Sequence, residues 1–84
     1  MKRKYVLKFV AIPKDDTERL DMYSITKLLA SLQNKYCFDI LKVSVIETSG
    51  LEGTITIKCK PLQKFNIFND FLLNVVGTLI YVNY

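Results

Sequence analysis

The segment at residues 54–60, which reads Thr-Ile-Thr-Ile-Lys-Cys-Lys, constrains the fold of this chain more than any other. Apolar and polar residues alternate along it with a period of two, which is typical of a β-strand with one buried and one solvated face. Ile55, Ile57 and Cys59 are expected to point into a core, and the threonines and lysines between them to point to solvent. Such a strand belongs in an antiparallel sheet that leaves one face open.

The composition favours one domain with surplus apolar surface. The chain has 84 residues, enough for one hydrophobic core, so residues 1–84 are expected to form a single domain. Half of the residues are hydrophobic, and the mean hydropathy of +0.18 is high for a small monomer. Apolar side chains that a small core leaves uncovered are often buried by a second subunit, so we expect a homodimer.

The rest of the chain reads as three more strands and two helices. β-branched and aromatic residues dominate the strand runs, and apolar residues recur at helical spacing in the helix runs. The strands are expected at 4–12, 40–48, 54–60 and 78–84, and the helices at 21–36 and 62–76. The apolar helix faces are Ile25, Leu28, Leu29, Leu32 and Tyr36, and Leu62, Phe65, Phe68, Leu72 and Val76, widened by Phe71 and Val75. Asp21 is expected as N-cap, with Asp16 as an earlier alternative, and Gly77 at C′.

This order of elements, β-α-β-β-α-β, resembles the ferredoxin-like or split-βαβ plan. We therefore expect an α+β fold in which a four-stranded antiparallel sheet, of strand order 4-1-3-2, carries two helices on one face. The first strand should be central, because both of its faces bear apolar residues. The buried face of the sheet should carry Leu7, Phe9, Ile55 and Ile57, with Leu28, Leu32, Phe68 and Leu72 packed onto it.

The hairpin formed by the second and third strands sets the position of the two cysteines. Its predicted register places two apolar sets on the same face, Leu41, Val43 and Val45 of the second strand and Ile55, Ile57 and Cys59 of the third. This arrangement requires a loop of three or five residues, and a left-handed glycine at Gly50 or Gly53 suits the shorter one. Cys59 would then lie opposite residue 41 or 43, roughly 13–20 Å from Cys37. A disulfide needs Cα atoms within about 7 Å, so we expect two reduced thiols.

The sequence offers little for catalysis. It has no histidine, the most frequent general base, and its glycines form no phosphate-binding loop. Asp15, Asp16, Glu18 and Asp21 form its carboxylate cluster. One or two carboxylates can hold Mg²⁺, which leaves a metal-dependent nuclease using Asp15 and Asp16 as a remote alternative. Acidic residues also favour helix N-termini, so we expect them to serve the helix start, with no catalytic residue, metal or cofactor.

The open face of the predicted sheet is a candidate binding surface. We expect it to be basic on one half and apolar toward the first and fourth strands, near Val6 and Val10, which we assign to a dimer interface. The net charge of +4 is compatible with a nucleic-acid ligand, although arginine, which grips phosphates bidentately, is scarce. The residues that would neutralise the phosphates of a nucleic acid are Lys8, Lys42, Lys58 and Lys60.

The last strand should lie at a sheet edge, with free backbone groups that can pair with a second copy. It contains none of the lysines, prolines or charges that usually prevent such pairing. Leu79 and Tyr81 should lie on one face and Ile80 and Val82 on the other, so one of these pairs should lie on the open side. The predicted dimer either pairs the last strands edge to edge or buries the apolar half of the open face.

Two functional hypotheses follow from these patterns. The first is a non-catalytic interaction protein that self-associates through its sheet and binds another macromolecule, and the second is a nucleic-acid-binding module that uses the lysine-bearing face. Lys8 interrupts the apolar run near the start of the sequence, so we expect no signal peptide. The uncharged run at 71–84 is shorter than the roughly 20 residues of a membrane span. We therefore expect a cytoplasmic protein with no membrane contact.

Overall fold

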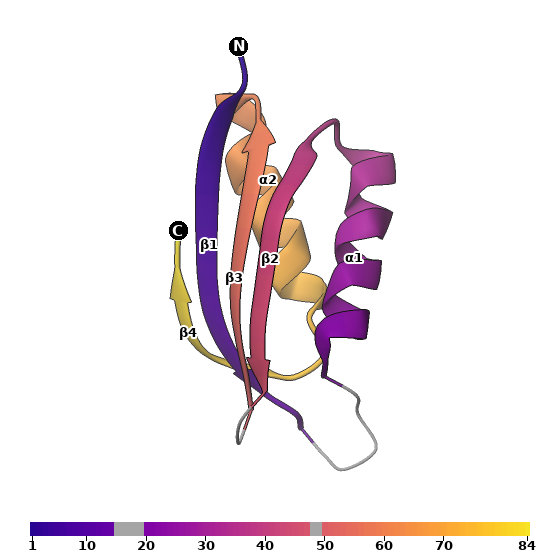
Figure 1. The fold of residues 1–84 in the computed structure, drawn as a ribbon, viewed down its shortest axis with the longest axis vertical. Helices are drawn as coiled ribbons and strands as arrows, with labels where there is room; N and C mark the ends of the chain where they lie inside the picture. The colour runs from indigo at the N-terminus through magenta and orange to yellow at the C-terminus, as the bar shows by residue number, and fades with distance from the viewer. Residues whose placement is uncertain (15–19, 48–49) are drawn as a thin grey trace.

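The computed structural model describes residues 1–14, 20–47 and 50–84 of the chain. Its elements follow in the order β1 (Arg3–Ile12), α1 (Met22–Lys35), β2 (Asp39–Glu47), β3 (Leu51–Cys59), α2 (Pro61–Asn74) and β4 (Thr78–Asn83). The strands form a four-stranded antiparallel sheet in the order β2-β3-β1-β4, and both helices lie on one face of it (Figure 1). The predicted ferredoxin-like α+β arrangement and its strand order are confirmed.

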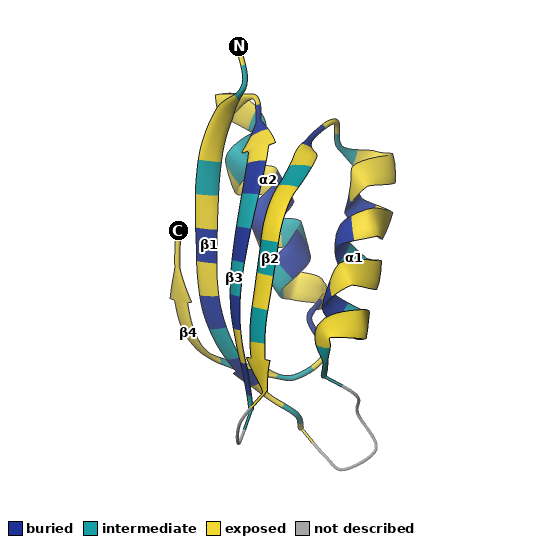
Figure 2. Ribbon diagram, viewed as in Figure 1, coloured by how far each residue is buried: buried dark blue, intermediate teal, exposed yellow. Residues whose placement is uncertain are grey.

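The core lies between the helices and one face of the sheet. Buried and exposed positions alternate along β1 and β3 (Figure 2), as the period of two predicts. The strands contribute Leu7, Phe9, Ile55 and Ile57, and the helices contribute Ile25, Leu29, Leu32, Ile67, Phe68 and Phe71. Leu28 and Leu72 pack at the margin of this cluster. The predicted packing of both helices onto this face is therefore confirmed.

The buried side of α2 differs in part from the predicted one. Phe68 and Phe71 are buried, whereas Leu62 and Phe65 are exposed. α2 carries apolar residues on several sides, so their spacing alone does not identify the side that faces the sheet. The rings of Phe71 and Phe9 meet edge to face, with centroids 5.4 Å apart, and this contact orients α2 on β1.

Local interactions determine where the helices start. The Asp21 side chain accepts a hydrogen bond from the Ser24 amide at 2.9 Å, and the Ser24 hydroxyl accepts one from the Asp21 amide at 3.1 Å. This reciprocal pair is a capping box and confirms Asp21 as the N-cap of α1. α2 begins with Pro61, whose fixed φ suits a first helical position and which has no amide hydrogen to satisfy.

The turn after α2 requires a glycine, although not at the predicted position. α2 ends at Asn74 with Val75 as its C-cap, so Val76 occupies C′ and the prediction for Gly77 is wrong by one residue. Gly77 has a φ of +143°, a backbone conformation that favours glycine. A Cβ atom there would also lie 2.8 Å from the carbonyl oxygen of Ile12. Both the backbone conformation and the lack of space exclude a side chain.

A β-bulge shifts the register between β2 and β3. Val43 lies opposite Ile55 and Ile40 lies opposite Ile57, whereas the predicted register, with Cys59 opposite residue 41 or 43, placed Val43 or Val45 opposite Ile57. The extra residue in β2 is Leu41, which is exposed. The predicted inward position of Leu41 is therefore wrong, because one unpaired residue reverses the alternation on one side of the bulge.

The hairpin loop has the shorter of the two predicted lengths. Glu47 lies opposite Leu51, so residues 48–50 connect β2 to β3. Gly53 is not a loop residue, because it pairs with Val45 on one side and Phe9 on the other, within β3. The predicted alternative of a loop glycine at Gly53 is therefore wrong.

The two cysteines lie in different surroundings, and both are free. Cys59 is fully buried in the core, where desolvation raises the pKa of its thiol, whereas Cys37 is exposed. The predicted register is wrong here as well, because Asp39 lies opposite Lys58. Cys37 is two residues before Asp39 and Cys59 is one residue after Lys58, so the two cysteines lie near the same end of the β2–β3 ladder. The prediction of free thiols with Cys59 in the core holds, although the separation on which it was based does not.

Candidate interaction surfaces

β4 lies at an edge of the sheet and is bonded to β1 on one side. Among the described residues, no strand neighbours its other side, so this side presents backbone groups for pairing. Its sequence, Thr-Leu-Ile-Tyr-Val-Asn, contains no lysine, proline or charged residue of the kind that normally prevents strand addition. The predicted free edge is confirmed.

A second β-bulge changes which residues of β4 share a face. Tyr81 lies opposite Val10, and Leu79 lies opposite Ala11, so Ile80 is the extra residue. Tyr81 therefore points to the open face with Val10, whereas Leu79 shares the helix-covered face with the buried Ala11. The predicted pairing of Leu79 with Tyr81 on one face is wrong, because the bulge reverses the alternation between them.

The other predicted pair is also separated. Val82 lies opposite the buried Phe9, on the helix-covered face, whereas Ile80 is unpaired and 59% exposed at the bulge. The predicted sharing of a face by Ile80 and Val82 is therefore wrong. Val6 lies on the open face as predicted, opposite Thr56.

A set of exposed apolar side chains on β4 and α2, joined through the ring of Tyr84, is a candidate interface. We call it the edge surface, and it comprises Leu62, Phe65, Leu73, Val76, Ile80, Val82 and Tyr84. The ring of Tyr84 connects the two elements, because its centroid lies 6.4 Å from that of Phe65 and 5.6 Å from that of Phe68. Leu62 is 92% exposed and Leu73 is 76% exposed, which is unusual for large apolar side chains of one helix.

α2 has two charged residues, Lys64 and Asp70, and both contact side chains of other elements. The Lys64 ammonium lies 5.0 Å from the ring centroid of Tyr5 and 5.8 Å from that of Tyr84, so it makes cation–π contacts with both. Asp70 lies on the side of α2 that faces α1, where it contacts Lys35. The side chains that make up the edge surface are therefore uncharged, and Lys64 lies at its margin, over the ring of Tyr84.

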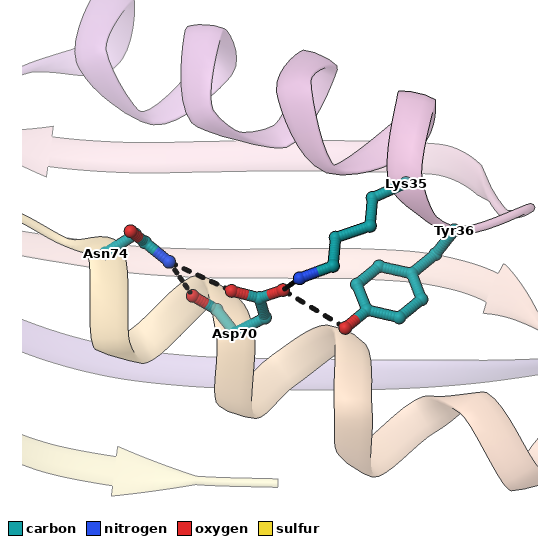
Figure 3. A network of polar contacts seen from close by, with 4 residues as sticks. All are labelled: Lys35, Tyr36, Asp70 and Asn74. Carbon is teal, nitrogen blue, oxygen red and sulfur yellow. Dashed lines mark hydrogen bonds and ion pairs between the residues drawn. The ribbon is translucent and has the colours of Figure 1, made fainter.

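Asp70 joins the two helices through a polar network (Figure 3). Its carboxylate accepts hydrogen bonds from the Lys35 ammonium at 2.8 Å, the Tyr36 hydroxyl at 3.1 Å and the Asn74 side-chain amide at 2.9 Å. The hydrogen bonds from Lys35 and then Tyr36 lower the pKa of Asp70, and the hydrogen bond to Asp70 raises the pKa of Lys35. The network connects the end of α1 to α2, which is a structural role.

The open face of the sheet is most basic near the start of β1. Lys4 lies directly opposite Lys58, and Lys58 lies opposite Asp39 on its other side. The Lys2 ammonium is 3.5 Å from the Asp39 carboxylate, so Lys2 joins the same row. We call Lys2, Lys4, Lys8, Lys42 and Lys58 the lysine surface. Lys2 lies before the predicted first strand and was therefore not among the predicted phosphate-binding lysines.

Of the four lysines predicted to bind phosphates, three belong to the lysine surface and Lys60 does not. Lys8 and Lys42 lie on the open face, opposite Thr54 and Thr56 respectively. Lys60 follows the end of β3 and is the N-cap of α2, so its predicted place on the sheet is wrong. The apolar Ile46, Val10 and Tyr81 of the open face share one row with the exposed Glu52, and Val6 lies on β1 between Lys4 and Lys8. Lysines and apolar residues therefore mix on β1, whereas the prediction divided the face into a basic half and an apolar half.

Outside these surfaces, the described residues form a further hollow and no metal-ligand cluster. A shallow concavity of about 430 Å³ runs along α1 and is lined by Asp21, Tyr23, Ser24, Lys27, Leu28 and Ser31. No group of three or more potential metal ligands occurs among residues 1–14, 20–47 and 50–84. Asp15, Asp16 and Glu18 of the predicted acidic cluster lie outside the described residues. In the described part of the chain, no helix combines the length and the hydropathy of a membrane span.

Comparisons with known proteins found no similar protein. No protein-family model matches the chain, and neither the curated proteins nor the solved structures contain a match to it.

Proposed function

We propose that this chain is a non-catalytic interaction protein that forms a homodimer through the edge surface and binds another macromolecule. The observation that carries the proposal is the uncharged free edge of β4, which the ring of Tyr84 connects to the exposed Phe65 on α2. Apolar patches of this kind on small domains usually mark interfaces. The protein is proposed to act in the cytoplasm, because Cys37 and Cys59 are free and a reducing compartment keeps thiols so.

Two copies can pair their β4 strands antiparallel about a two-fold axis, which joins both sheets into one. Such pairing satisfies the free backbone groups of both edges and is a recognised mode of association. It also brings the outward sides of the two α2 helices toward each other, where Phe65 and Tyr84 supply aromatic contact area. A two-fold interface uses the same patch on both copies, and this patch spans a strand and its neighbouring helix.

Charge favours this mode over a dimer built on the open face. Each copy carries a net charge of +4, and the lysine surface concentrates cations on the open face. Two open faces pressed together would bring like charges into proximity, which is unfavourable. The edge surface reduces this repulsion, because its own side chains are uncharged and Lys64 lies only at its margin, over Tyr84.

Sedimentation of variants at both edges of the sheet tests the proposal. Ile80→Lys places a charge at the β4 edge, and Ile46→Lys makes the same exchange at an exposed site on β2, the opposite edge strand. We expect the wild type and Ile46→Lys to be dimers at high micromolar concentration and Ile80→Lys to be a monomer. A monomeric wild type, or an Ile80→Lys variant as dimeric as Ile46→Lys, would overturn the proposed interface.

A further inference from the structure

We propose that the open face of the sheet binds single-stranded nucleic acid, with phosphates on the lysine surface and a base stacked on Tyr81. The proposal concerns the face of the sheet and not its edge, so it applies to a monomer as well as to a dimer paired through β4. It rests on three observations: the placement of like charges, the polar rows between them, and the position of Tyr81 next to them.

The first observation is that Lys4 and Lys58 lie directly opposite each other on β1 and β3. Like charges in this position destabilise a sheet, so a ligand that carries negative charge relieves an unfavourable contact. Asp39 offsets part of the charge on the other side of Lys58, but it is shared with Lys2. The row therefore keeps an excess of positive charge.

The second observation is that the next rows place lysines among hydroxyl groups. Lys42 lies opposite Thr56, and Lys8 lies opposite Thr54. Ser44 lies on the far side of Thr54, so polar groups continue across β2, β3 and β1. Lysine, threonine and serine side chains are common donors to the phosphate backbone, whereas none of them reads base sequence by itself. The surface suits sequence-independent backbone binding.

The third observation is the aromatic ring that the β4 bulge brings to this face. Tyr81 is 50% exposed and lies opposite Val10, two residues along β1 from Lys8. The row that contains Lys4 lies six residues from Val10, which is about 20 Å along the strand. A strand of nucleotides can therefore place several phosphates on the lysines while one base lies over Tyr81.

These features favour a single strand over a duplex. The bases of a single strand are free to stack on an aromatic side chain, whereas those of a duplex are already stacked on each other. The open face, with an exposed tyrosine toward one end, offers such a platform. The ligand is defined here by its phosphates and unpaired bases, which DNA and RNA single strands share.

Fluorescence anisotropy with labelled oligothymidylate, oligouridylate and a duplex of the same length tests the proposal. We expect both single strands to bind more tightly than the duplex at low salt. Lys58→Gln should weaken binding and lower the slope of log K against log salt by about 0.7, the value for one phosphate contact on a single strand. Lys27→Gln removes one exposed charge from α1 and serves as the matched control, with no change expected in the slope.

The stacking contact is tested at the same ring. Tyr81→Ala should weaken binding about tenfold or more, whereas Tyr81→Phe should preserve it, because phenylalanine keeps the ring face. Sedimentation of both variants separates this loss from a change in oligomeric state. No wild-type binding at low salt, equal effects of Lys58→Gln and Lys27→Gln, tighter binding to the duplex, or unchanged binding by Tyr81→Ala would overturn the proposal. Displacement of the oligonucleotide by equimolar polyglutamate would also overturn it and identify an acidic protein segment as the ligand.

Discussion

The ring of Phe9 covers the position at which Gly53 lacks a side chain. The two residues are opposite each other on β1 and β3, and a Cβ atom on Gly53 would lie 2.4 Å from Cε1 of Phe9. From this position the Phe9 ring contacts Phe71 of α2 edge to face. The glycine thus makes space on the sheet for the ring that anchors α2.

Gly53→Ala should destabilise the domain by about 1–3 kcal/mol, because the added methyl group overpacks the core against the Phe9 ring. Denaturant unfolding measures the loss. Phe9→Leu removes the ring edge that the methyl group meets, so in the double variant Gly53→Ala should cost less than it does alone. Strictly additive losses would show that the close approach of Phe9 to Gly53 does not determine the cost.

Ile57 and Thr56 are neighbours on β3 that point to opposite faces. Ile57→Ala should cost about 2–4 kcal/mol of unfolding free energy, because Ile57 is fully buried and the substitution leaves a cavity. Thr56→Ala, on the open face, should cost well under about 1 kcal/mol. Both values come from the same denaturant melts, and equal losses would contradict the assignment of faces.

The Asp70 network should make stability depend on pH at both extremes. The pKa of Asp70 is lowered in the folded state, so its contribution is present above about pH 3.9, the unfolded pKa, and is lost as pH falls through the folded value. The pKa of Lys35 is raised, so its contribution is present below about pH 10.4 and is lost at higher pH. Asp70→Asn should reduce the acid dependence of stability in unfolding melts taken between about pH 5 and about pH 2. An unchanged acid dependence would assign it to other carboxylates.

The capping box makes a separate prediction about Asp21. Asp21→Ala should destabilise the domain by about 1 kcal/mol through loss of the N-cap, and Asp21→Asn, which keeps an acceptor oxygen, should cost less. Neither variant should alter the response of thermal unfolding to Mg²⁺. A melting temperature that rises with Mg²⁺ in the wild type and not in Asp21→Ala would instead assign a metal-binding role to this residue.

Self-association should appear in thermal stability as well as in sedimentation. A dimer that unfolds to two monomers has a melting temperature that rises with protein concentration. We expect this rise for the wild type and for Ile46→Lys, and a concentration-independent melting temperature for Ile80→Lys. Similar concentration dependence in all three proteins would contradict a dimer that is held together at β4.

Periodicity in the sequence was enough to predict the order of elements and the buried faces of β1 and β3, and the resemblance of that order to the ferredoxin-like plan supplied the strand order. The buried faces depend on local alternation, which places Leu7 and Ile55 on one side of their strands whatever their partners are. The capping residue Asp21 was also predictable, because its contacts lie within four residues of it. The edge position of β4 followed from the strand order alone.

The two bulges and the rotation of α2 were decided by the tertiary structure. Leu41 and Ile80 are ordinary strand residues, and only the hydrogen-bond ladders to neighbouring strands show which residue is left unpaired. The exposure of Leu62 and Leu73 depends on which side of a largely apolar helix meets the sheet. That side is set by the contact of Phe71 with the Phe9 ring, which lies over Gly53. A local pattern specifies faces relative to its own element, whereas register and rotation arise from contacts between elements distant in the sequence.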